Sequence, residues 1–403
     1  MMPHEPGDEL ASVRSAVLVV VIGMVSAMHI GKLPVAIPVL RAELGLSLVE
    51  AGYLLSLVQV AGMLGGLSVG LLADKAGPRR VMLVGLAVLT LSSLLGSMSQ
   101  GVAQLLWTRG AEGAGFLLSV LPAPALLRLT VRNPMALSKA LGWWGAYMPV
   151  GTATAMLVGG TLIGSVGWRG LWLLLGVLTG GCAWLLWARV PGTHGIAPSS
   201  AFVPRLLRTL RASGPWYAAL AFFCYSGQWL AVVGFLPTIY SGASLPVSVV
   251  GWLSALAAGI NMTGNIAAGR LLARGVAPVR LLLTGYVAMG LGALLTFGVP
   301  ESPLLGYLGV LVFSAFGGLI PGTLFSLAVS LSPGSDTIST TVGWMQQWSS
   351  LGQFLGPPVV AMVAVWVGGW SMTWMATGAC SVIGVALAWR LQGLWRQLAR
   401  PLH

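Results

Sequence analysis

Residues 24–41 read Met24-Val-Ser-Ala-Met-His29-Ile-Gly-Lys32-Leu-Pro34-Val-Ala-Ile-Pro38-Val-Leu-Arg41, and they place a histidine and a lysine inside an apolar stretch that begins near Ser15. A cation at the depth of a bilayer costs several kcal/mol unless it faces water, a partner or a ligand. His29 and Lys32 lie one helical turn apart and therefore share a helix face. We interpret them as the lining of a translocation pathway. The alternative is that Lys32 extends its stem to the outer interface and His29 is a neutral, hydrogen-bonded helix residue.

The composition of the whole chain agrees with a membrane environment. Apolar residues make up 56% of the 403 residues and charged residues 7%, and the mean hydropathy is +0.88. A soluble globular chain of this size does not have this composition. The net charge of +12 would suggest nucleic acid in a soluble protein, but here we interpret it as a signal of membrane topology, and we expect no nucleic-acid partner.

The apolar segments define the expected architecture. A membrane-spanning helix needs about 20 apolar residues, and such segments lie near 15–40, 49–73, 79–98, 102–127, 136–163, 169–189, 214–240, 247–272, 279–299, 303–331, 339–367 and 370–392. The sequence therefore predicts an all-α membrane protein with twelve transmembrane helices in two pseudo-symmetric six-helix bundles. The predicted domains are an N-terminal bundle (1–189), a cytoplasmic linker (190–213) and a C-terminal bundle (214–403).

The basic residues predict the orientation of these helices. Nearly all of the 21 lysines and arginines fall on one side of the predicted spans. Arg41 and Arg169 lie on the other side, while Lys32 and Arg109 lie within the membrane. Because cytoplasmic loops carry the excess of basic residues, both termini are expected in the cytoplasm, and the expected location is the bacterial inner membrane.

Three sequence echoes relate the two halves at a nearly constant offset. Gly31-Lys-Leu-Pro34 recurs as Gly234-Phe-Leu-Pro237, the stretch 71–78 recurs as 271–278, and Gly167-Trp168 recurs as Gly369-Trp370. They indicate a duplicated six-helix unit, which in transporters places the ligand between the halves. The intramembrane charges all fall in the first half. The second half offers neutral polar side chains instead.

Three motifs carry a resemblance to a known family. Gly70-Leu-Leu-Ala-Asp74-Lys75-Ala-Gly77-Pro-Arg79-Arg80 resembles the signature loop of the major facilitator superfamily. Leu105-Leu-Trp-Thr-Arg109-Gly-Ala-Glu112-Gly113-Ala-Gly115 is similar to the family's second motif, whereas Gly145-Ala-Tyr-Met-Pro149-Val-Gly151 resembles only weakly the motif of its antiporters, which argues against drug/proton antiport. His29–Pro34, Gln346-Gln347-Trp348 and Gly352–Pro357 look most like the bacterial cyanate-permease-like branch.

The resemblance implies a conformational latch at the loop after the second span. Asp74 would meet the positive N-terminus of a helix in the other half, and Lys75, Arg79 and Arg80 would support that contact and reach anionic headgroups. The alternative is a purely topological anchor.

The membrane charges suggest how a solute would be bound. Lys32 and Arg109 would attract an anionic group, while Glu112 or His29 would carry a proton. A self-contained Arg109–Glu112 ion pair is the alternative. The candidate substrate-binding residues are His29, Lys32, Arg109, Tyr147, Tyr225, Gln228, Asn261, Asn265, Gln346 and Gln347.

These observations predict a proton-coupled secondary transporter, an importer of a small anionic or zwitterionic organic solute that works by alternating access. The alternatives are an exporter of hydrophobic compounds and a metal or metal-chelate transporter, the latter because Met24, Met28 and His29 could hold Cu(I). A receptor or scaffold is the rival from another class.

No phosphate loop, nucleophile elbow or zinc-helix spacing appears, so we predict no enzyme activity and no cofactor. The expected partners are a small-molecule substrate, protons and membrane lipids, and the protein is expected to be a monomer.

Overall fold

The computed structural model describes residues 6–131, 133–192, 202–242, 245–299 and 301–398, and within these ranges every regular element is a helix. The helices of the first half are α1 (Pro6–Leu44), α2 (Leu48–Leu57), α3 (Val60–Ala76), α4 (Pro78–Ser97), α5 (Val102–Val120), α6 (Ala123–Thr130), α7 (Pro134–Gly145) and α8 (Tyr147–Arg189). The others are α9 (Phe202–Arg211), α10 (Ser213–Ser241), α11 (Val247–Gly259), α12 (Asn261–Ala273), α13 (Pro278–Gly298), α14 (Pro303–Gly317), α15 (Leu319–Leu331), the 3-10 turn η1 (Ser335–Thr337), α16 (Ile338–Val367) and α17 (Trp374–Leu398).

These helices form the predicted membrane passes. Eleven segments of the described chain are long and apolar enough to cross a membrane. One of them, α8, contains two helices that meet at Gly167, whose backbone is non-helical with φ 66° and ψ 176°. A positive φ is accessible to glycine at little cost. With α8 counted as two passes, the predicted twelve-helix fold class is confirmed.

Several passes are interrupted near their middle. α2 and α3 meet at Val58 and Gln59, and α11 and α12 meet at Ile260. By contrast, α1 continues as one helix through Pro34 and Pro38. Interruptions are tolerated in membrane helices where neighbouring helices satisfy the freed backbone groups.

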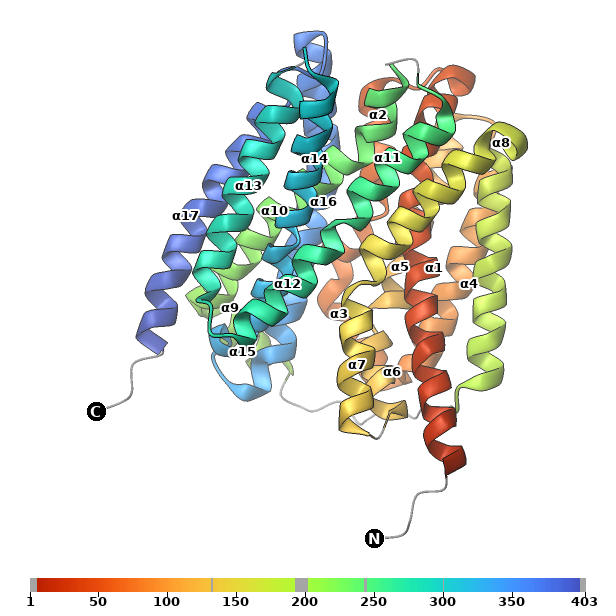
Figure 1. The fold of residues 1–403 in the computed structure, drawn as a ribbon. Helices are drawn as coiled ribbons and strands as arrows, with labels where there is room; N and C mark the ends of the chain where they lie inside the picture. Colours follow the sequence, from red (N-terminus) through yellow and green to blue (C-terminus); the bar gives the residue numbers. More distant parts are fainter. Residues whose placement is uncertain (1–5, 132, 193–201, 243–244, 300, 399–403) are drawn as a thin grey trace.

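The two bundles lie side by side, and α1 begins at the same end of the molecule at which α17 finishes (Figure 1). α1 packs against α8 and α4 against α5 in one bundle, whereas α10 packs against α16 and α13 against α14 in the other. We call the end where α1 begins and α17 finishes the terminus end, and the opposite end the far end.

The halves are in close contact toward the far end. α8 and α11 approach so closely that a Cβ added to Gly160 would lie 2.6 Å from the Gly251 Cα atom. The contact between α2 and α16 is also close, because a Cβ on Gly52 of α2 would lie 2.9 Å from the Cα atom of Pro358 in α16. Phe235 of α10 packs in one buried apolar cluster with Leu33 and other side chains of the first half. The space between the bundles is therefore closed at the far end.

The link between the halves is a helix at the terminus end. Residues 193–201 of the predicted linker lie outside the described residues, but α9 follows them. Arg208 of α9 pairs with Asp336 in η1, and the Thr209 hydroxyl lies 2.8 Å from that of Thr340. α9 is thus attached to the start of α16.

Candidate functional site: a buried charge cluster and a central cavity

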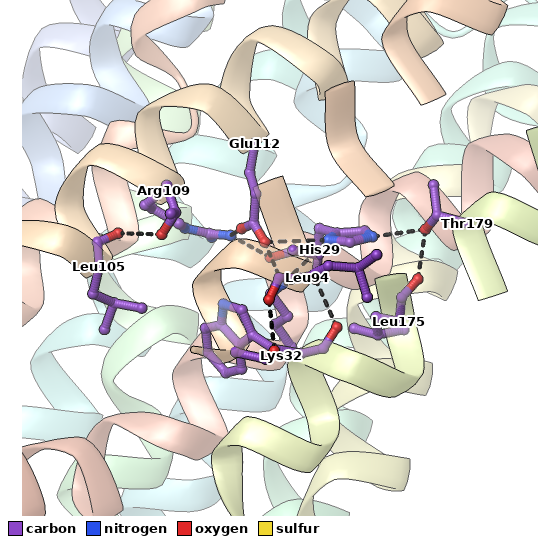
Figure 2. Close-up of polar contacts among 12 residues, drawn as sticks. His29, Lys32, Leu94, Leu105, Arg109, Glu112, Leu175 and Thr179 are labelled. Atoms are coloured by element: carbon purple, nitrogen blue, oxygen red, sulfur yellow. Dashed lines mark hydrogen bonds and ion pairs between the residues drawn. The ribbon is translucent and has the colours of Figure 1, made fainter. Parts of the chain in front are cut away.

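Four ionisable side chains of the first half form a closed cluster (Figure 2). His29 and Lys32 come from α1, and Arg109 and Glu112 come from α5 at an i, i+3 spacing. Lys32 Nζ lies 2.5 Å from Glu112 Oε1, and Arg109 Nη1 lies 2.7 Å from Glu112 Oε2. None of the four residues is more than 1% exposed.

The Lys32 ammonium is fully satisfied within this cluster. Its three donors go to Glu112 Oε1, to Ser93 Oγ at 2.9 Å and to His29 Nδ1 at 3.2 Å. The nitrogen also lies 4.3 Å from the centroid of a Trp172 ring, which is a cation–π distance. A lysine so bound has no donor left for a solute.

The hydrogen bonds around His29 define its tautomer. The Thr179 hydroxyl donates to the Leu175 carbonyl at 2.7 Å, so its oxygen accepts from His29 Nε2 at 2.8 Å. Nδ1 then carries no proton and accepts from Lys32. His29 is therefore neutral, and both ring nitrogens are occupied by protein groups. Among the described residues no group of three or more His, Cys, Asp or Glu side chains could hold a metal ion.

Arg109 connects three helices. Its Nε donates to the Leu54 carbonyl of α2 at 3.1 Å, and its Nη1 donates to the His29 carbonyl of α1 at 2.6 Å. Its Nη2 is buried without a hydrogen-bond partner in the described structure. With two cations, one carboxylate and a neutral imidazole, the cluster carries one surplus positive charge.

A separate cavity of about 940 Å³ lies between the bundles. On α12 its lining reaches Arg270, near the point where this helix ends at the terminus end (Figure 1). Arg270 is the only charged side chain among the described lining residues. Much of the wall is aromatic, from Phe116, Trp143, Trp144, Tyr147, Phe222, Tyr225, Trp229 and Phe325. A largely apolar wall with few polar groups is typical of small-molecule sites.

Some of the predicted site residues line this cavity and others do not. Lining positions are occupied by Tyr147, Tyr225, Asn261, Asn265 and Gln346. The Tyr225 hydroxyl donates to Asn261 Oδ1 at 3.2 Å, Asn265 Nδ2 donates to the same oxygen at 3.1 Å, and Asn261 Nδ2 donates to the Ser314 carbonyl at 2.8 Å. These bonds hold the two asparagines in place at the break between α11 and α12.

The remaining candidates lie elsewhere in this conformation. His29, Lys32 and Arg109 are in the closed cluster and are not among the lining residues. Gln228 accepts a hydrogen bond of 3.1 Å from Ser381, which joins α10 to α17 away from the cavity. Gln347 has a buried side-chain oxygen without a partner in the described structure and is not a lining residue either. The geometry thus differs from the expectation that α1 turns its cations into a wet crevice.

Two glutamines of the cavity were not among the sequence-based candidates. Gln59, at the junction of α2 and α3, donates from Nε2 to Gln353 Oε1 of α16 at 2.9 Å. Both line the cavity and are at most 7% exposed. Gln353 lies in a stretch that the family resemblance had marked, and Gln59 is a lone amide in an apolar span. Their pairing across the halves has no signal in a single sequence.

The predicted latch is only partly described. Asp74 lies in α3, but its side chain is outside the described side chains. Arg79 donates to the Trp187 carbonyl of α8 at 2.6 Å, whereas Lys75 and Arg80 are exposed. The latch therefore stays a prediction.

Twelve helical passes in two bundles around a central cavity define a membrane protein with a transporter architecture. The chain belongs to the Major Facilitator Superfamily, whose family model matches residues 18–357. It is 30% identical over 310 residues to the cephamycin export protein CmcT of Amycolatopsis lactamdurans, a match that covers 74% of this chain and 60% of that protein. It is also 32% identical over 129 residues to the multidrug resistance protein Stp of Mycobacterium tuberculosis, which covers 32% of this chain and 23% of that protein.

Solved structures share the fold across nearly the whole chain. A bacterial homologue of the human lysosomal transporter Spinster, in an inward-facing and occupied conformation, superposes with a TM-score of 0.77 at 16% identity and covers 96% of this chain and 98% of its own. The nucleoside transporter NupG gives a TM-score of 0.77 at 11% identity, with 96% and 100% covered. The predicted family is confirmed. The cyanate-permease-like branch is not, since none of these relatives is a cyanate permease.

Proposed function

We propose that this transporter exports medium-sized, largely apolar aromatic compounds by alternating access. The observation that supports this most strongly is the chemistry of the cavity, whose wall is aromatic and whose single charged side chain, among the described residues, is Arg270. Export was the alternative in the sequence analysis. The names of the relatives, which include a cephamycin exporter and a multidrug resistance protein, support it as well.

The open end of the cavity is compatible with loading from the cytoplasm, as export requires. The positive-inside pattern predicts that both termini are cytoplasmic, and the cavity lining reaches Arg270 on α12, toward the end where α1 begins and α17 finishes (Figure 1). The conformation is then inward-facing, and a compound enters the cavity from the cytoplasm. Separation of the halves at the far end would release it on the other side.

Import of a small anion is less well supported. That function needs Lys32 and Arg109 at the solute, yet the donors of Lys32 are used within the protein and the cluster is not part of the cavity wall. For energy coupling we propose a proton gradient with Glu112, the only fully buried carboxylate among the described side chains, or His29 as the proton-carrying group. Either would take a proton only in a conformation in which the ion pairs of the cluster have opened.

Dye export from bacterial cells tests the proposal. Cells that express the protein and are loaded with the uncharged dye N-phenyl-1-naphthylamine should lose its fluorescence faster on energisation than cells without it. Trp144 stacks on Tyr147 with ring centroids 4.4 Å apart, and both line the cavity. A dye ring stacked on Trp144 would lose one aromatic contact in Trp144→Ala. Such a contact contributes about 0.5–1.5 kcal/mol, so this variant should slow export by roughly 2- to 12-fold at low dye concentration.

The matched control is Trp366→Ala. Trp366 is on α16 but is 86% exposed on the outer surface of the molecule, so this variant should export the dye at the wild-type rate. Equal export with and without the protein, together with accumulation of benzoate in proteoliposomes, would replace our proposal with the anion importer.

A further inference from the structure

The closed end of the cavity contains a pair of buried amides, one from each half. Val58 and Gln59 are the lining residues nearest the far end at the α2–α3 junction, and Gln59 is the polar one; Gln353 is the farthest lining residue of α16 toward the far end. Beyond them, Gly52 and Pro358 bring the helices into backbone contact. A compound that enters from the terminus end therefore meets this pair last.

The pair leaves hydrogen-bonding capacity unused. Each glutamine amide has two donors and an oxygen that accepts twice. The only bond between them runs from Gln59 Nε2 to Gln353 Oε1 at 2.9 Å. In the described structure Gln59 Oε1 accepts no hydrogen bond, and Gln353 Nε2 makes only a long contact of 3.4 Å to Ser349 Oγ. A free acceptor from one half thus lies next to a free donor from the other.

Buried polar groups with unused capacity are costly in a dry environment. Both glutamines are nine-tenths buried or more, and both contact the cavity. The cavity wall also contains a pair of asparagines, Asn261 and Asn265. This pair differs from the glutamine pair because Asn261 already accepts two hydrogen bonds and donates one within the protein. At the closed end of the cavity, the amide groups available to a bound compound are therefore those of the glutamine pair.

We propose that Gln59 and Gln353 form a two-part binding site for a primary carboxamide or lactam group of the transported compound. In such a group the N–H and the C=O lie on the same edge, so the N–H can donate to Gln59 Oε1 while the C=O accepts from Gln353 Nε2. The aromatic wall holds the rest of the compound. This assignment rests on the proposed function, and it names the chemical group that the exporter selects.

The site also explains how binding would involve both halves. One hydrogen bond of the ligand goes to the first half and the other to the second. The compound then bridges the bundles at the level where their direct polar contact is the single Gln59–Gln353 bond. Ligand sites of transporters with repeated halves lie at this kind of interface.

Two isosteric probes test the site in the purified full-length protein. Naphthalene-2-carboxamide has the donor and the acceptor, whereas 2-acetonaphthone replaces the amide nitrogen by a methyl group and has only the acceptor. Equilibrium dialysis measures the Kd of each. A hydrogen bond of ordinary net strength changes affinity by about 2- to 12-fold, so the wild-type protein should prefer the carboxamide by a factor in this range.

Variants assign the preference to the pair. Gln59→Leu removes the acceptor for the ligand N–H, and the variant should bind both probes with equal affinity. Gln353→Leu removes the donor to the carbonyl, which both probes share, so both should bind more weakly while their ratio stays near that of the wild type. Gln228→Leu makes the same chemical change at a buried amide outside the cavity and should keep wild-type values for both probes. Gln59→Asn, which shortens the side chain but keeps the amide, gives a second test if Gln59→Leu does not fold.

The outcomes separate this site from the proposed function. If the wild-type protein binds both probes equally and Trp144→Ala weakens both, the cavity binds aromatic compounds and the amide site is wrong. If neither probe binds, the exporter proposal and the amide site both fail. A carboxamide preference that survives in Gln59→Leu and Gln59→Asn also overturns the assignment.

Discussion

Replacing Glu112 with glutamine should destabilise the protein strongly, because it removes the only negative charge of the buried cluster. The carboxylate accepts from Lys32 at 2.5 Å and from Arg109 at 2.7 Å, and all three side chains are at most 1% exposed. The substitution raises the surplus charge of the cluster from one to two. Breaking a buried ion pair from one side costs about 3–5 kcal/mol. At about 2–4 °C per kcal/mol for a bundle of this size, the thermal midpoint should fall by roughly 6–20 °C.

Two further variants show whether charge is the cause. Lys32→Met leaves the Glu112–Arg109 pair intact and makes the cluster neutral, so it should cost less than Glu112→Gln, at most about 2 kcal/mol from the lost hydrogen bonds. The double variant should lose less stability than the sum of the single variants, by about 0.5–3 kcal/mol, as expected for residues in contact. Glu301→Gln, at an exposed turn, is the matched control and should melt like the wild type.

Thermal melting of the purified variants, followed by the fluorescence of the chain's tryptophans, measures these differences. The reasoning is refuted if Glu112→Gln melts within about 2 °C of the wild type, a shift that corresponds to about 0.5–1 kcal/mol. It is equally refuted if Lys32→Met is the more damaging single change. Either result would mean that the surplus charge is compensated by groups other than Glu112.

Three other predictions follow from single contacts. Gly160→Val should abolish dye export without loss of folded protein, since a Cβ there would lie 2.6 Å from an α11 backbone atom and hold the far end apart, whereas Gly164→Val, which meets nothing within 4 Å, should export normally. Asn261→Ala should weaken binding of N-phenyl-1-naphthylamine about 2- to 12-fold in equilibrium dialysis, because Tyr225 and Asn265 lose their shared acceptor. Arg208→Ala should lower the free energy of unfolding by no more than about 1 kcal/mol, since the ion pair of Arg208 with Asp336 is half exposed. A larger loss of stability in thermal melting would show that this pair fixes α9.

The fold followed from features that a single sequence displays. Hydropathy located the passes, and the echo of Gly167-Trp168 in Gly369-Trp370 located equivalent turns in the two halves. In the structure Gly167 is the bend within α8, and Gly368 ends α16 with a φ of 77° just before the second turn. The internal breaks of the passes were not predicted. At Val58 and Gln59, for example, no proline marks the end of α2.

The site was harder to predict because a cation within the membrane can be stabilised in two ways, by facing water or by pairing with groups inside the protein. His29 and Lys32 were expected to face water, since a bare cation in the membrane is costly. The structure instead surrounds Lys32 with Glu112, Ser93 and His29, which come from three different helices. The i, i+3 spacing of Arg109 and Glu112 does indicate their ion pair. The contribution of Ser93 and Thr179 depends on packing that no local pattern encodes.

The strength of the contacts within and between the halves suggests how the protein moves. Inside the first half, the cluster ties α1, α2, α4, α5 and α8 together through ion pairs and hydrogen bonds whose loss costs several kcal/mol. Between the halves near the cavity, the direct polar contact is one amide hydrogen bond, worth about 1 kcal/mol. Where the first half has Lys32, the second has Phe235, which packs near Trp370 with ring centroids 5.2 Å apart. The first bundle is therefore held together as one body, while the polar contact between the halves at the cavity is weak enough to be exchanged for contacts with a bound compound. In the proposed alternating access, the apolar and backbone contacts at the far end would have to separate as well.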